Sequence, residues 1–306
     1  MELYWYFAAA SFVFGLVLGS FLNVCIYRLP RDLSVSTPAR SFCPNCKTQI
    51  AAYDNIPVFS WMMLRGRCRH CHQPISARYM VIELFTAGLF LACYMHFGGT
   101  TVETVKAAVF CFLILGLIFT DLETRLLPDV MTIPGLMFGL LFAAVIPMHG
   151  TLEARYGFPS ALASLWHSPR LLSVGDAALA GAIGAAVLFA VAESYYRLRG
   201  FEGMGMGDVK LIAMIGAFLG LRLLLFVLFT ASLAGAVYGL SVLFNVYRRR
   251  RRRYGKLPEA RHKAWESASK AMRLVEIPFG VFLGGMALVG LFYGNSLMRW
   301  YFGLYF

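Results

Sequence analysis

The sequence predicts an all-α polytopic membrane protein with about eight transmembrane helices and one small zinc-ribbon-like loop domain. Of its 306 residues, 59% are hydrophobic and only 14% are charged, whereas soluble domains average about 25% charged residues. Uncharged apolar runs recur along almost the whole chain, and several reach the length of about 17–25 residues that a membrane-spanning helix needs. One loop carries four cysteines in two Cys-x-x-Cys pairs. These three observations predict the fold class.

The expected helices follow one another along the chain. Four runs are long enough to span a bilayer unaided: residues 3–27, 130–148, 223–247 and 277–298. Residues 177–192 span it if their flanks are included, and residues 81–97 span it with one glutamate, Glu83, inside the run. We expect residues 3–27 to be a retained helix and not a signal peptide, because no basic segment precedes the run and no small-residue cleavage site follows it.

Two further apolar runs are short. Residues 107–120 end at Asp121, and residues 211–221 begin just after Asp208. At about 1.5 Å per residue, a run of eleven residues covers roughly 16 Å. We therefore expect these two helices to hold their charged ends below the membrane surface, or the bilayer to thin around them.

The positive charges predict the orientation of the chain. Eight helices place both termini on one side, and the other side then holds residues 28–78, 121–129, 193–210 and 247–273. These segments carry 8, 1, 3 and 11 Lys and Arg residues, which is 23 of the chain's 28. Because basic loops favour the cytoplasm, we expect both termini in the periplasm and both aspartates, Asp121 and Asp208, at the cytoplasmic face. The net charge of +12 is thus a topology signal and requires no nucleic-acid partner.

The loop cysteines predict a zinc site. Cys43 and Cys46 form one pair, Cys68 and Cys71 form the other, and 21 residues separate the pairs. Paired knuckles at this spacing are typical of tetrahedral zinc, and cytoplasmic thiols stay reduced. Four thiolates leave no open position for water, so we expect one structural Zn²⁺ that stabilises a loop too small for its own core.

Other residues of metal-binding type have simpler interpretations. His70 and His72 adjoin the second pair and are expected to be exposed loop residues and not ligands. Cys25, Cys93 and Cys111 lie in apolar runs and are expected to be small packing residues.

Asp121 and Asp208 are the candidate catalytic residues. Ionisable residues beside hydrocarbon are costly and usually functional. Two such carboxylates brought together could share a proton, which is the arrangement that an acid/base pair needs to activate water. Gly205 and Gly207 precede Asp208 and would let the backbone bend and substrate approach closely. A His-Glu-x-x-His motif and a Gly-x-Ser-x-Gly motif are both missing from the sequence.

Neighbouring acidic residues are expected to have structural roles. Asp121 alone could simply mark a helix end. Asp129 follows a proline and precedes an apolar run, which favours an N-cap. Glu123 is expected to be a solvated neighbour of Asp121 or a group that tunes its acidity.

With these motifs in their order along the chain, the sequence resembles the bacterial type IV prepilin peptidases over nearly its whole length. These are membrane aspartyl proteases of the Gly-x-Gly-Asp class. The opening signature is Gly19-Ser-Phe-Leu-Asn23 with Tyr27-Arg-Leu-Pro30, and the tetracysteine segment follows. Phe119-Thr-Asp121-Leu-Glu, Leu127-Pro-Asp129 and Gly203-Met-Gly-Met-Gly-Asp208 match the protease centre, and Ile277-Pro-Phe-Gly280 resembles the last-helix motif.

The resemblance implies a function. Members cleave the leader from prepilins or pseudopilins, before a residue that is usually phenylalanine, and tetracysteine members N-methylate the new terminus with S-adenosylmethionine. It makes Asp121 and Asp208 the catalytic pair of an enzyme in the bacterial inner membrane that serves a pilus or a secretion system. The expected division of the chain is a first helix (1–27), a methyltransferase-associated zinc loop (28–79) and the peptidase helices (80–306).

Two features depart from the family pattern. Val281 stands where a second proline is common. Residues 248–273 form a long basic insertion that begins with six arginines, Arg248 to Arg253. We expect this insertion to anchor on anionic lipids, with docking of pilus or secretion assembly proteins as the alternative.

Several functional alternatives remain at the level of sequence. The methyltransferase could be silent, because no glycine-rich nucleotide loop is present. Glu83 is a candidate for the methyl-donor site, but the same sequence pattern would fit a structural ion pair between Glu83 and an arginine such as Arg78. A proton-coupled transporter would need midplane carboxylates and inverted repeats, and neither is evident. A zinc-loop scaffold without catalysis would tolerate replacement of both aspartates.

Overall fold

The computed structural model describes residues 2–38, 40–43, 45–146, 168–200, 204–254, 262, 264–268 and 278–303. Within these ranges the regular structure is helical, apart from two isolated β-bridges in the tetracysteine loop. Six of the helices are long and apolar enough to cross a membrane, and α5 (Asp129–Val145) is a shorter apolar helix. The predicted all-α membrane fold is confirmed, while the number of spans stays a prediction.

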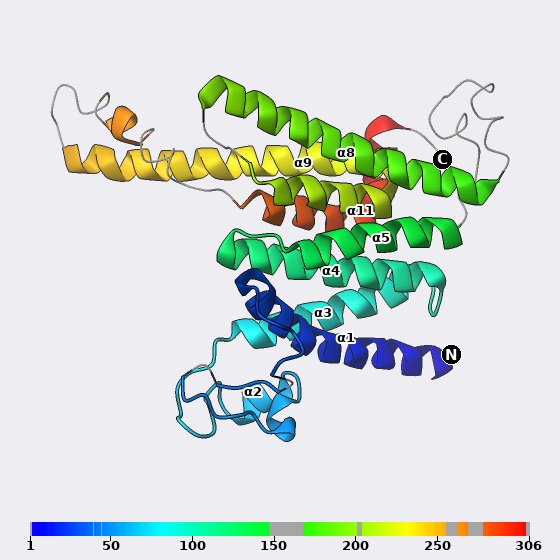
Figure 1. Cartoon of the computed structure of the whole chain (residues 1–306), viewed down its shortest axis with the longest axis vertical. Coiled ribbons are helices and arrows are strands. Elements are labelled where there is room, and N and C mark those ends of the chain that lie inside the picture. Colours follow the sequence, from blue (N-terminus) through cyan, green and yellow to red (C-terminus); the bar gives the residue numbers. More distant parts are fainter. Residues whose placement is uncertain are drawn as a thin grey trace.

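The helices lie side by side in one stack, with the tetracysteine loop and its short helix α2 (Phe59–Met63) at one end (Figure 1). The long helices are α1 (Glu2–Arg28), α3 (Arg78–His96), α4 (Val102–Thr124), α8 (Pro169–Arg199), α9 (Met206–Tyr254) and α11 (Phe279–Phe302). The N-terminus and the end of α11 lie on one side of this stack (Figure 1). The tetracysteine loop, the α4–α5 turn and the end of α9 lie on the opposite side, as the predicted topology requires.

Two glycines bring α1 against α3. A Cβ atom at Gly15 would lie 2.6 Å from the Cα of Ala87, and one at Gly19 would lie 2.7 Å from the Cα of Glu83. Small residues four apart allow this close approach of backbones, which is a common way for membrane helices to pack. The contact fixes the end of α1 beside the start of α3, and both ends border the loop.

The helix α9 is broken at Gly220, whose φ of 77° and ψ of 169° lie outside the helical region. The break separates residues 206–219 from residues 221–254, close to the predicted boundary between two apolar runs. The first part carries Asp208 and is central to the bundle, since Leu211 and Ile212 are fully buried. A span this short is tolerated because protein, and not lipid, surrounds it.

Asp176 is a buried carboxylate that sequence reasoning did not single out. It lies on α8 and is 7% exposed. A Cβ atom at Gly220 would lie 2.5 Å from its Oδ2 atom, so the carboxylate packs directly against the break in α9. The residue at this break must therefore lack a side chain as well as adopt a positive φ.

Helix α4 corrects one expectation. The predicted run of residues 107–120 is the apolar part of a 23-residue helix that begins with Thr101 as its N-cap, whose side chain accepts the N–H of Thr104. Polar residues in its first turn hid this start. At about 1.5 Å per residue, α4 is roughly 35 Å long and does not require a thinned bilayer.

Half of the basic insertion lies outside the described residues, as do Ile277 and Gly203 of the quoted motifs. Its six arginines continue α9 beyond the apolar region. The rings of Tyr247 and Trp265 meet edge to face with centroids 6.0 Å apart, so part of the insertion packs back on the end of α9.

Candidate functional site

Asp121 and Asp208 come together from two helices. Asp121 lies in the last turn of α4 and is 6% exposed, and Asp208 lies half-buried in the first turn of α9. Their carboxylates are near enough to interact electrostatically. The fold therefore creates the pair of neighbouring carboxylates that the sequence predicted.

The start of α11 holds the carboxylate of Asp121. The backbone N–H of Val281 donates to Asp121 Oδ2 at 3.1 Å. This N–H belongs to the first helical turn, where backbone donors have no partner within the helix. A proline at position 281 would have no N–H to donate, so this hydrogen bond requires another residue there.

Glycines make room at the aspartates. A Cβ atom at Gly280 would lie 3.0 Å from Asp121 Oδ2, and one at Gly207 would lie 2.9 Å from the Cβ of Leu127. A Cβ atom at Gly205 would have only the backbone N of Gly207 nearby, at 3.9 Å, among the described residues, and the Gly205 carbonyl accepts the N–H of Asp208 at 3.2 Å. Gly207 thus serves packing against the α4–α5 turn, and Gly205 leaves the approach to Asp208 open.

Asp129 is not an N-cap, and the sequence-based interpretation was wrong. The N-cap of α5 is Pro128 and has no side-chain hydrogen bond. Both carboxylate oxygens of Asp129 instead accept from Nζ of Lys210 at 2.7 Å. Lys210 is two residues after Asp208, so this ion pair connects the start of α5 to the segment that carries the second aspartate.

The four loop cysteines form one cluster. One sulfur atom from each of Cys43, Cys46, Cys68 and Cys71 lies within 4.8 Å of the others, and the Cys43–Cys71 distance is 3.8 Å. Zn–S bonds of about 2.3 Å in a tetrahedron imply S···S distances of about 3.8 Å. The cluster therefore has the geometry of a tetrahedral metal site.

The two cysteine pairs lie in two separate backbone turns of the same kind. The N–H of Cys43 donates to the carbonyl of Thr48, and the N–H of Cys68 donates to that of Gln73. The residues that follow the pairs, Lys47 and His72, both have a positive φ, near 57° and 55°. These two similar turns direct both pairs of thiols to one point.

Nearby hydrogen-bond donors favour the thiolate form of two of these cysteines. The side chain and backbone of Thr48 lower the pKa of Cys46 to about 6. The backbone N–H groups of Cys71 and His70 lower the pKa of Cys68. Among the described residues, His70 and His72 are exposed and outside the cluster, as expected.

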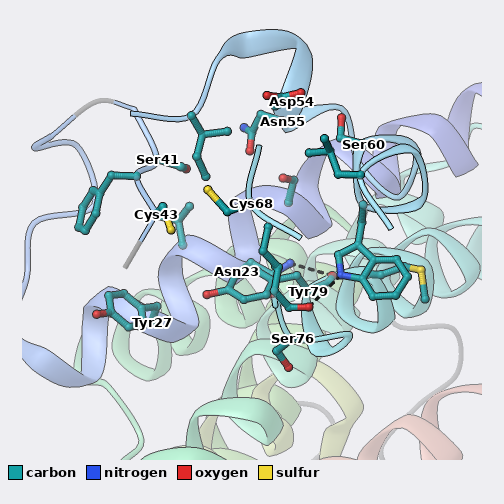
Figure 2. Close-up of a pocket in the computed structure, with 18 of the residues that line it drawn as sticks. Asn23, Tyr27, Ser41, Cys43, Asp54, Asn55, Ser60, Cys68, Ser76 and Tyr79 are labelled. Atoms are coloured by element: carbon teal, nitrogen blue, oxygen red, sulfur yellow. Dashed lines mark hydrogen bonds between the residues drawn. The ribbon is translucent and has the colours of Figure 1, made fainter. Parts of the chain in front are cut away.

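A cavity of about 540 Å³ lies between the tetracysteine loop and the ends of α1 and α3. Figure 2 shows loop residues on one side of it and residues of α1 and α3 on the other, with Cys43 and Cys68 between them. Its volume is typical of a small-molecule site. The lining includes Tyr27, Trp61, Tyr79 and Glu83. Aromatic rings and a carboxylate suit a ligand that combines a flat ring with a positive charge.

Glu83 lies in this cavity and is only 8% exposed. Its Oε2 atom accepts the N–H of Val58 at 2.7 Å. The ion pair with Arg78 that was considered from sequence is not formed, because Arg78 pairs with Glu123. Glu123 is therefore an exposed neighbour of Asp121 that also forms an ion pair with α3, and a role in tuning the acidity of Asp121 stays a prediction.

Two loop contacts were not predicted from sequence. Nη1 of Arg28 donates to the carbonyls of Ser34, Val35 and Pro38 at 2.9–3.1 Å, which orders the start of the loop. Asp54 accepts two hydrogen bonds from Arg69, which lowers the pKa of Asp54. Arg28 lies within the opening signature and Arg69 within the second cysteine pair, but their carbonyl and carboxylate partners depend on the folded loop.

Comparison with known proteins gives consistent matches over most of the chain. The model of the bacterial peptidase A24 N-terminal domain matches residues 13–97, and that of the type IV leader peptidase family matches residues 107–240. A protein of Aeromonas hydrophila named prepilin leader peptidase/N-methyltransferase is 35% identical over 97% of this chain and 94% of its own length.

This chain belongs to the type IV leader peptidase family. Proteins with the same name from Legionella pneumophila and Myxococcus xanthus (strain DK1622) are 32% and 41% identical. The matches cover 98% and 78% of this chain, and 96% and 63% of the respective relatives. No solved structure gives a significant match.

The two family models match two successive parts of the chain, and each part contains one group of candidate site residues. The N-terminal model spans the four cysteines and Glu83, and the second model spans Asp121 and Asp208. The cysteines and Glu83 thus lie in one family-defined region, and the two aspartates lie in the other.

Proposed function

We propose that this protein removes the N-terminal leader of type IV prepilins or pseudopilins and then N-methylates the new N-terminal residue. The observation that carries the proposal is the convergence of Asp121 and Asp208 on one side of the helix stack, in a chain whose relatives are named for both activities. The relatives' names combine a peptidase and a methyltransferase. Two activities fit this fold, because the aspartates and the loop cavity lie at separate places in it.

The aspartate pair would hydrolyse the peptide bond without a covalent intermediate. One carboxylate is ionised and takes a proton from water, while the other is protonated and donates a hydrogen bond to the scissile carbonyl. The two exchange roles as the amine leaves. The N–H of Val281 would keep Asp121 in position throughout the reaction. Asp121 accepts this hydrogen bond through Oδ2 alone, so its other oxygen stays available.

The loop cavity would hold the methyl donor. S-adenosylmethionine supplies an electrophilic methyl group on a positively charged sulfur, and Glu83 and the aromatic residues of the cavity suit its charge and its adenine ring. The four cysteines would hold one structural Zn²⁺ that keeps the loop in place above the cavity. Glu83 is the carboxylate that we propose contacts the donor or the amine.

The proposed setting is the bacterial inner membrane, with both termini in the periplasm and both sites toward the cytoplasm. The predicted cytoplasmic side is the side with the tetracysteine loop and the arginines of α9. Arg248 to Arg253 would contact anionic lipid headgroups, and the insertion could also meet assembly proteins of a pilus or secretion system.

One assay tests both activities. Purified protein in lipid is incubated with a prepilin, with and without S-adenosylmethionine, and the product mass is measured. We expect loss of the leader in both samples and one added methyl group only with the donor. Asp121→Asn and Asp208→Asn should each abolish cleavage while the protein stays folded and inserted. Cleavage by either variant at a near wild-type rate would refute the catalytic assignment, and cleavage without methylation would leave a peptidase alone.

A further inference from the structure

Asn23 carries a buried hydrogen-bond acceptor with no partner among the described residues. The side chain lines the loop cavity, and the residue is only 3% exposed. Its Nδ2 donates to the carbonyl of Gly19 at 3.3 Å and to that of Tyr79 at 3.0 Å, and its Oδ1 has no donor. Figure 2 shows Asn23 beside Tyr79 on the helical side of the cavity.

The orientation of this amide is determined by its neighbours. Both groups that contact Nδ2 are backbone carbonyls, which can only accept. A flipped amide would place Oδ1 against these two oxygens, so the nitrogen and oxygen are assigned without ambiguity. A buried acceptor without a donor is costly, and native proteins usually supply a ligand or another group for it.

Asn23 and Glu83 line the same cavity, from α1 and from α3. Asn23 meets Tyr79, and Gly19, one turn earlier on α1, meets Glu83, one turn later on α3. The two positions are therefore offset by about one helical turn along the α1–α3 contact. A neutral acceptor and a carboxylate in one cavity suit a primary ammonium group, which has three N–H donors.

We propose that Asn23 Oδ1 binds the free N-terminal amine that leader removal creates and holds it beside Glu83 for methylation. This inference rests on the proposed methyltransferase function of the cavity. Asn23 would be a binding residue for the acceptor peptide and not for the methyl donor.

The place of the cavity supports delivery of this amine. Glu123 lines the cavity and is two residues after Asp121 on the same end of α4. The ion pair of Glu123 with Arg78 joins this end of α4 to the start of α3. The terminus released at the aspartates thus emerges at a helix end that also borders the cavity.

The test uses the full-length protein in lipid and peptides that begin with the mature phenylalanine. One peptide has a free amine, and its competitor carries an N-terminal trimethylammonium group, which keeps the charge but has no N–H. We expect the wild-type protein to bind the free amine about tenfold or more tightly, as a hydrogen bond to a charged group implies. Asn23→Leu should remove this preference, raise KM for the amine peptide and leave KM for S-adenosylmethionine unchanged.

Asn55→Leu is the matched control, because Asn55 lines the same cavity but is exposed. It should keep the preference for the free amine. Leader cleavage by the same preparations tests whether the Asn23 variant is folded. If the variant does not fold, the binding of the two peptides to the wild-type protein still tests the proposal. Equal binding of both peptides by the wild type, or a higher KM for S-adenosylmethionine in Asn23→Leu, would overturn the proposal. Wild-type protein that methylates no peptide would instead refute the underlying methyltransferase function.

Discussion

At the scale of single residues, the backbone at the start of α11 holds Asp121. The N–H of Val281 donates to the carboxylate, and Gly280 leaves the space in which that carboxylate lies. Neither contribution comes from a reactive side chain. Small changes here should therefore affect the position of Asp121 without changing its chemical nature.

Gly280→Ala should reduce leader cleavage tenfold or more. The added methyl group would lie 3.0 Å from Asp121 Oδ2 and 3.3 Å from Leu127 Cδ1, so the carboxylate must shift. Alanine is otherwise favoured over glycine in a helix by about 1 kcal/mol, so α11 itself should not be weakened. Gly285→Ala is the control on the same helix, since no atom lies within 4 Å of its Cβ position. Equal cleavage by both variants would contradict this role of Gly280.

Asp129→Asn should leave most of the leader cleavage. Asp129 and Lys210 form an exposed ion pair, with side chains 54% and 37% exposed, and such pairs contribute about 0–1 kcal/mol. Cleavage rate and thermal unfolding midpoint, measured together, check this. A loss as complete as that expected for Asp121→Asn would show that Asp129 takes part in catalysis.

At the scale of elements, the tetracysteine loop depends on its metal more than on its core. Regular structure in the described part of this loop is limited to short helical segments and two isolated bridges. The two cysteine turns lie on separate segments, and a shared metal would hold them together. Folding and metal binding should therefore be coupled.

Replacing Cys43 and Cys46 together by serine should release one zinc per chain and disorder the loop. Elemental analysis measures the metal, and limited proteolysis of the loop measures its order. Acidification should also release the metal, because protons compete for the thiolates. Cys93→Ser is a suitable control, since Cys93 is buried within the bundle and lies outside the cluster. Wild-type protein purified without chelators that contained no zinc would exclude a zinc site.

At the scale of the whole molecule, α4 connects the two sites. Asp121 faces α9 and α11, whereas Glu123 borders the loop cavity and pairs with α3. The sites are thus adjacent but formed by different residues. Their activities should be separable by mutation even though methylation requires an amine that only cleavage creates.

Asp121→Asn and Asp208→Asn should still methylate a peptide whose phenylalanine terminus is already free. Glu83→Gln should do the reverse, with normal cleavage and poor methylation, because its carboxylate lies in the cavity and not at the aspartates. Product masses from both substrates measure the two activities independently. Aspartate variants that cannot methylate the pre-cleaved peptide would show that the two sites work only as one.

Much of the fold and of the candidate site was predictable from the sequence. Long apolar runs and the paired cysteines predict membrane helices and a metal cluster through local patterns, and the two aspartates stand out because charge is rare beside such runs. The division into residues 1–27, 28–79 and 80–306 stays a prediction, as does the number of spans. Helix ends were predicted less well, since polar first turns concealed the start of α4.

The sequence by itself thus determined the fold class, and it singled out the four cysteines and the two aspartates, whose roles and membrane side stay predictions. Only the tertiary structure decided the partners of several residues: Lys210 for Asp129, Glu123 for Arg78 and Val281 for Asp121. It also decided that the side-chain carbonyl of Asn23 meets no donor within the part of the chain that the structure describes. The physical reason is that hydrophobic patterns and knuckle spacing are local, whereas hydrogen bonds and ion pairs join residues up to 160 positions apart. Such contacts depend on which helices pack together, and no local pattern specifies that.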